Sequence, residues 1–224
     1  MTKTCYMCDN PSVSKEHCPP KCVFPECKDA NGKDYRKDLI TVPSCDDHNS
    51  AKSKDDEYLM MVLTSYFDNN KAAQEQIKSK IVRAWTKNPG LSTTIVKNLQ
   101  PVATRDGERH AFEVDTPRFN RSLEWAANGL YYETYGSRIA QPYKVISYPL
   151  VQLEGPDAAA VNAERGRILL LANKMLEGFP ITGANPEIFW FQVSPVVEER
   201  SVLRMCFFEA FQVIAMSSPT LEVG

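Results

Sequence analysis

Cysteine placement is the feature that most constrains this chain. Six of its seven cysteines and two of its three histidines lie within the first 48 of 224 residues. The N-terminus lacks the apolar stretch of a secretory signal, which predicts a cytoplasmic location, where disulfides are rare. Clustered cysteines in such a chain indicate bound metal. The N-terminal segment is therefore expected to be a small module held together by ligands more than by core.

Two ligand pairs share the same tight spacing. Two residues separate Cys5 from Cys8, and two residues separate Cys45 from His48. This gap lets both side chains of a pair turn toward one ion, so the two pairs together predict a closed, tetrahedral, structural zinc site. The remaining cysteines of this segment have looser spacings and are interpreted as buried small residues, as one replacement ligand, or as part of a second zinc site. They are Cys18, Cys22 and Cys27.

Composition and charge limit the classes of function. Hydrophobic residues make up 43% of the chain, enough for a real core. No apolar run approaches the roughly 20 residues needed to span a bilayer, so no membrane partner is expected. The net charge of −2 argues against a protein that simply coats nucleic acid. Residues 71–109 are locally basic, which indicates either phosphate contacts or a solvated helix face.

The sequence predicts an α+β fold: a zinc-bound module, a helical middle and a small antiparallel sheet packed with helices. We expect two domains, 1–68 and 69–224. Apolar periodicity predicts helices, of which the clearest begins with Thr116 as N-cap and ends at Gly136. The expected helices cover 50–67, 71–86, 91–99, 117–135 and 158–177. The expected strands cover 39–42 (ended by Pro43), 143–151, 189–194, 202–208 and 211–217, and residues 101–115 are expected to form a loop or irregular hairpin.

A family resemblance appears when the residues around the ligand pairs are included. Glu16-His17 lies between the pairs, and Asn49 directly follows the second pair. This order over residues 5–60 resembles the HNH endonucleases of the ββα-metal class. The resemblance implies a treble-clef-like module in which zinc staples a two-stranded ribbon to a helix, with the active site between the two.

The resemblance also implies roles for individual residues. His17 matches the general base, while Glu16 and Asn49 match the residues that hold a catalytic divalent ion. Asp38 matches a position that orients the base through the backbone, although the family often has Asn there. His48 stands where many members have Cys, a change that zinc tolerates.

The implied function is metal-dependent hydrolysis of phosphodiester bonds in DNA, with RNA as an alternative substrate. A neutral histidine suits proton removal at cellular pH, and one Mg²⁺ or Mn²⁺ suits carboxylate and amide oxygens. The family hints at mobile elements or antiphage defence. Residues 117–224 show no ligand cluster, and their role is interpreted as substrate docking, dimerisation or sensing of a signal. The domain over 69–224 is thus where a homodimer or a partner contact is expected. The alternative interpretation is a catalytically silent zinc module that binds nucleic acid or a protein.

Overall fold

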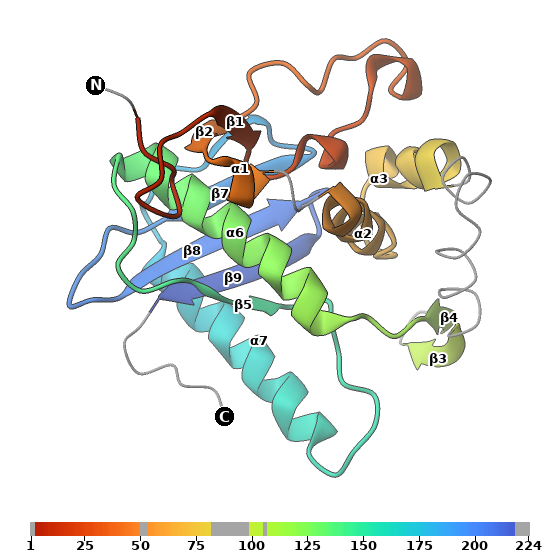
Figure 1. Ribbon diagram of the computed structural model, residues 1–224. Coiled ribbons are helices and arrows are strands. Elements are labelled where there is room, and N and C mark those ends of the chain that lie inside the picture. Colours follow the sequence, from red (N-terminus) through yellow and green to blue (C-terminus); the bar gives the residue numbers. More distant parts are fainter. Residues whose placement is uncertain (1–2, 50–52, 82–98, 105–106, 218–224) are drawn as a thin grey trace.

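A computed structural model describes residues 3–49, 53–81, 99–104 and 107–217 (Figure 1). The N-terminal part is built from two short strands, two 3₁₀ turns and two helices. These are β1 (Ser14–His17), 3₁₀ turns at Lys21–Val23 and Cys27–Asp29, β2 (Thr41–Ser44), α1 (Asp46–Asn49) and α2 (Ser53–Thr64). The elements that follow are α3 (Lys71–Gln76), a π-helical turn (Ile77–Ile81), β3 (Gln100–Thr104), β4 (Gly107–Ala111), α6 (Thr116–Tyr135), β5 (Lys144–Ser147), α7 (Ala158–Met175), β6 (Thr182–Asn185), β7 (Phe189–Val193), β8 (Ser201–Phe207) and β9 (Phe211–Ser217).

Within the described residues, five antiparallel strands form the main sheet in the order β5-β9-β8-β7-β6. Helix α6 lies on one face of this sheet and α7 on the other (Figure 1). Strand side chains alternate between the two faces. Leu203 and Met205 of β8 belong to the large core on the α6 side, whereas Val202 packs with Leu176 at the end of α7. The expected α+β class with a small antiparallel sheet is confirmed.

Helix α6 begins one residue earlier than expected. Asp115 is the N-cap, and its carboxylate accepts a hydrogen bond of 3.1 Å from the backbone N–H of Arg118. Thr116 is already helical, so the predicted N-cap was wrong by one position. Gly136 ends the helix as predicted, with φ 69°, a left-handed conformation that glycine adopts without strain. The expected apolar stripe is buried: Phe119, Leu123, Ala126 and Leu130.

Pro43 does not end its strand, contrary to the prediction. It lies inside β2, opposite Lys15 of β1. The backbone N–H of Cys18 donates to Ile40 O at 3.1 Å, so these two residues form a hydrogen-bonded pair. In an antiparallel ribbon, hydrogen-bonded pairs alternate with pairs that are not hydrogen-bonded. Pro43 occupies an intervening position, where the backbone nitrogen faces away from β1 and a donor is not needed.

Other elements differ in smaller ways. Residues 101–115 include a regular antiparallel hairpin, β3–β4. Strand β6 was not expected from the sequence. The helix expected over 71–86 is described only as far as Ile81, and nearly all of the helix expected over 91–99 lies outside the described residues. No helix in the described ranges is both long and apolar enough to cross a membrane.

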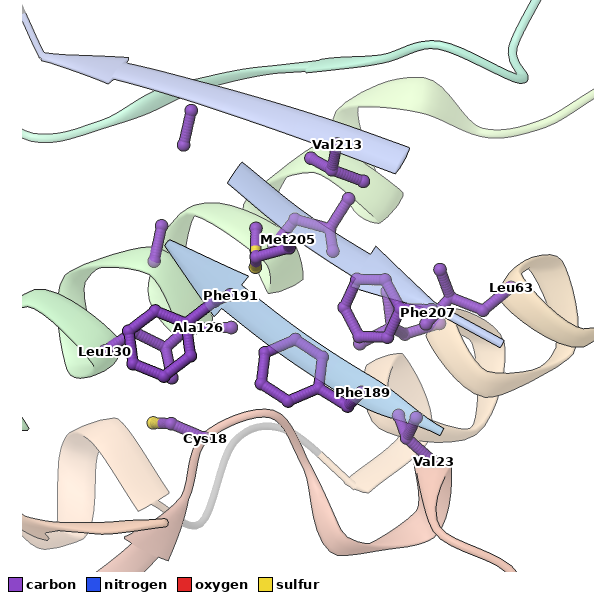
Figure 2. Close-up of a cluster of buried hydrophobic side chains, with 14 of the residues drawn as sticks. Cys18, Val23, Leu63, Ala126, Leu130, Phe189, Phe191, Met205, Phe207 and Val213 are labelled. Atoms are coloured by element: carbon purple, nitrogen blue, oxygen red, sulfur yellow. The ribbon is translucent and has the colours of Figure 1, made fainter. Parts of the chain in front are cut away.

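The hydrophobic core runs from the N-terminal segment into the sheet. Figure 2 shows Cys18 and Val23 facing Phe189 and Phe191 of β7, with Leu63 of α2 beside them. All five side chains belong to one buried cluster. The division of the chain at residue 68 therefore stays a prediction, while the packing joins both sides of it.

Gly129 of α6 allows a close approach between this helix and the N-terminal segment. A Cβ at this position would overlap Cys18 Sγ and lie 3.2 Å from Cys18 Cβ. We expect Gly129→Ala to destabilise the chain by about 1–3 kcal/mol, because the packed core cannot give way freely. Thermal unfolding would show this as a Tm lowered by about 2–4 °C per kcal/mol.

Gly166 in α7 provides the matched control. A Cβ there would meet no atom within 4 Å. Gly166→Ala should therefore leave Tm unchanged or raise it, since alanine favours a helix interior over glycine by about 1 kcal/mol. Equal destabilisation by both substitutions would contradict the packing described here.

Candidate functional site

Four predicted ligands meet at one point. The ligand atoms of Cys5, Cys8, Cys45 and His48 all lie within 4.8 Å of one another. The Cys8 and Cys45 sulfurs are 3.7 Å apart, and His48 Nδ1 lies 3.7, 3.6 and 3.2 Å from the sulfurs of Cys5, Cys8 and Cys45. In a tetrahedral site with zinc bonds of about 2.3 Å to sulfur and about 2.0 Å to nitrogen, these separations are about 3.8 Å and about 3.5 Å. The cluster could hold a metal ion such as zinc.

Backbone hydrogen bonds bring the two pairs together. The N–H of Tyr6, within the first pair, donates to Pro43 O of β2 at 2.8 Å. Cys45 immediately follows β2, and the N–H of His48 donates back to Cys45 O at 3.2 Å as α1 begins. The first ligand loop is thus fixed to the strand that delivers the second pair.

Burial and backbone amides shape the cluster electrostatically. Cys5 is fully buried, and burial alone would raise its pKa. Backbone N–H groups offset this, including that of Met7 at 3.4 Å from the sulfur, and they hold the pKa of Cys5 below its ordinary value. The ring of His48 packs edge-on against Trp125 of α6, with centroids 6.5 Å apart. These contacts favour the thiolate that a metal needs and close one side of the cluster.

The other cysteines do not assemble into a second cluster within the part of the chain that the structure describes. Cys18 is buried beneath Gly129, Cys22 Sγ donates to Asp56 O at 3.2 Å, and Cys27 is exposed. Burial raises the pKa of Cys206 to about 12, as suits a core thiol.

Glu16 and Asn49 are positioned on the same face of the β1–β2 ribbon. Glu16 Oε2 accepts hydrogen bonds from the hydroxyls of Tyr6 at 3.2 Å and Ser44 at 3.4 Å. The amide nitrogen of Asn49 donates to Ser14 Oγ at 2.8 Å. Ser14 pairs with Ser44 across the ribbon, so these bonds converge on neighbouring positions. The sequence predicted Glu16 and Asn49, but the three hydroxyls that hold them were missed.

His17 faces the other side of β1, because neighbouring side chains of a strand alternate. The ring is half-buried, and its Nδ1 is buried without a hydrogen-bond partner among the described residues. Burial, together with the positive charges of Lys21 and Arg36, lowers the pKa of His17, although Glu16 and the Ile40 backbone oppose the shift. The imidazole is therefore held neutral at neutral pH.

Asp38 lies apart from the other predicted site residues. Its side chain is exposed, its φ is 55°, and no hydrogen bond within the described ranges joins it to His17. The backbone that acts on the His17 ring belongs to Ile40, two residues further along. No local pattern marked Ile40, whose position follows from the register of β2 with β1.

Searches with family models, among curated proteins and among solved structures find no match to this chain. The roles of its residues therefore rest on their own chemistry and placement.

The cluster leads to a test of metal content. We expect the purified chain to carry one zinc ion and Cys45→Ala to lose it, because three donors hold zinc much more weakly than four. Loss of the metal should also loosen the N-terminal segment, measured as faster amide exchange in β1 and β2. Elemental analysis gives the metal content of each preparation.

Cys27→Ala is the matched control, since this cysteine is exposed and outside the cluster. It should keep full zinc. A Cys45→Ala variant that also keeps full zinc would refute the four-ligand assignment.

Proposed function

We propose that this chain is a metal-dependent endonuclease of the HNH type, with a structural zinc and a histidine general base. The supporting observation is the construction of β1. This one strand carries Glu16 and His17, and through Ser14 it also bonds Asn49, the residue directly after the second ligand pair. A module with a purely structural or binding role has no need for an acid and an amide on one face of this ribbon and a histidine at the adjacent position on the other face.

Zinc is assigned to the cluster by its donors. Three thiolates and one imidazole are soft and borderline ligands that suit zinc in a closed site. The order of the ribbon β1–β2 and then α1 at the second ligand pair supports this proposal, in which the three elements would form the ββα-metal module that the family resemblance implies. In this proposal zinc has no chemical step of its own and fixes the strand that carries the reacting groups.

Glu16 and Asn49 are proposed to hold a divalent ion, Mg²⁺ or Mn²⁺. Carboxylate and amide oxygens are the hard donors that such ions prefer, and both residues lie on one face of the ribbon. The hydrogen bond from Asn49 to Ser14 uses the amide nitrogen, which leaves the carbonyl oxygen as the group to bind a cation. When bound, the ion would stabilise negative charge on the phosphate and on the leaving oxygen.

His17 is proposed to take the proton from the attacking water. Its lowered pKa keeps the imidazole neutral and able to accept that proton. Water oxygen then forms a bond to phosphorus as the bond to the leaving oxygen breaks. Lys21 and Arg36, which contribute positive charge at His17, also suit the approach of an anionic DNA backbone. Asp38 keeps a predicted role in orienting this region through the backbone.

The direct test is plasmid nicking by the full chain with Mg²⁺ or Mn²⁺. We expect His17→Ala to lower the rate by about 10²- to 10⁴-fold, the usual contribution of general acid–base catalysis. Zinc content and thermal stability should be unchanged, because His17 lies outside the metal cluster. Both should be measured on the same preparations.

His110→Ala is the matched control, since this exposed histidine lies on β4, outside the proposed site. It should cleave at the wild-type rate. Undiminished cleavage by His17→Ala would overturn the assignment of the base. A wild-type chain that binds DNA, keeps its zinc and cleaves nothing would instead support the silent zinc module.

A further inference from the structure

A cavity of about 600 Å³ lies between the end of α2, the β3–β4 hairpin, residues 148–153 and the first half of α7. This volume is in the range of pockets that hold small molecules. Most of the side chains that line it are apolar or aromatic, and its floor includes Val62 and Phe211, which are almost fully buried. The Tyr66 ring packs edge-on against Phe211, with centroids 5.8 Å apart. The core therefore fixes the floor of the cavity before any ligand binds.

The rim of this cavity gathers apolar side chains that water can reach. Four of the described residues that line it are large and apolar, and each is between 45% and 57% exposed: Phe67, Tyr148, Val151 and Leu153. A gathering of this kind normally marks a binding site, whereas single exposed apolar residues do not.

Charge in the cavity has one sign. Its charged lining residues, among those described, are Arg109 and Arg165; neither an aspartate nor a glutamate lines it, and His110 adds no negative charge. The Arg109 guanidinium lies 5.6 Å from the centroid of the Phe67 ring and forms no ion pair with the described residues. Arg165 donates one hydrogen bond to Leu150 O, which leaves its other N–H groups for a ligand.

We propose that this cavity binds a small amphipathic anion, which has an aromatic or apolar body and one acidic group. The body lies on the buried floor beside Tyr148, and the acidic group faces Arg109. A guanidinium is weakly hydrated and stacks on aromatic rings, so it suits an anion whose body is apolar. The adjoining hollow shares Arg165 but is also lined by Glu113 and Glu154, which places the acidic group at the Arg109 end.

A nucleic-acid backbone suits the cavity less well. Its phosphates are polar and evenly spaced, and they bind several cations along a surface. Here two arginines stand in a mostly apolar lining, so the ligand needs an apolar part that enters. The cavity is also separate from the proposed active site, because none of Glu16, His17 and Asn49 lines it.

Two fluorescent probes that differ only in the acidic group test the proposal on the full chain. They are 8-anilinonaphthalene-1-sulfonate and N-phenyl-1-naphthylamine, which has the same rings without the sulfonate. We expect the sulfonate to bind one saturable site with a dissociation constant on the order of 10–100 µM, the usual strength for a molecule of this size. No saturable binding by the folded wild-type chain would overturn the site.

Arg109→Gln tests the acidic group. It should weaken binding of the sulfonate about tenfold, because a charge-assisted hydrogen bond is lost, and leave the neutral probe within about twofold. Arg200→Gln is the matched control, an exposed arginine between β7 and β8 outside the cavity, and should bind both probes like the wild type. Equal effects of Arg109→Gln on the two probes would reduce the site to an apolar hollow and overturn the proposal.

Ala111→Phe tests the location. Ala111 lines the cavity and lies on the same face of β4 as Arg109, two residues away, so a phenyl ring there fills the space for the ligand. Both probes should bind at least tenfold more weakly, with Tm measured to show that each variant is folded. Unchanged binding to folded Ala111→Phe would place the probes elsewhere, and displacement of the sulfonate by a DNA duplex would assign the cavity to nucleic acid; either result overturns the proposal.

Discussion

The convergence of two ligand pairs, 36 residues apart in the chain, is the constraint on which the N-terminal segment depends. A metal ion held by these four donors would close the intervening segment into a loop whose ends could not separate. The backbone hydrogen bond from Tyr6 to Pro43 fixes β2 against the first pair, and β2 in turn sets the register of β1. Ribbons of two short strands are marginal alone in water, so a metal bound at the cluster would supply the order that a larger sheet would otherwise provide.

Helix α6 connects the N-terminal segment to the rest of the molecule. Its Trp125 packs on the His48 ring, and its Gly129 admits Cys18 from the segment between the pairs. Nearer its start, Arg118 bonds Asp55 of α2 at 2.7 Å, while the buried face of the helix covers the sheet. The metal cluster and the sheet are thus held by the same helix, and the proposed site is positioned from both sides.

Local patterns in the sequence were enough to predict what depends on local chemistry. The ligand pairs follow from spacing, and α6 from its periodicity and from Gly136, with an error of one residue where Asp115 and Thr116 compete as N-cap. Contacts set by distant parts of the chain could not be predicted. Strand β6 has no apolar alternation, and it forms because β7 pairs with it. Ser14, Ser44 and Tyr6 gather around Glu16 and Asn49 only through the register of the ribbon.

Because of these contacts, substitutions of the proposed site residues are not equally informative about catalysis. Glu16 accepts hydrogen bonds from Tyr6 and Ser44, both buried, so its removal would take an acceptor away from two interior hydroxyls and disturb the ribbon itself. A loss of cleavage in a Glu16 variant would mix a structural effect with a chemical one. No side chain depends on His17 in this way: its Nδ1 has no hydrogen-bond partner within the described residues, and the burial of this atom is a cost to the fold rather than a support. A ring with one nitrogen buried and unpaired at a cost to stability is the one whose removal reports on chemistry, because the fold has little to lose by it.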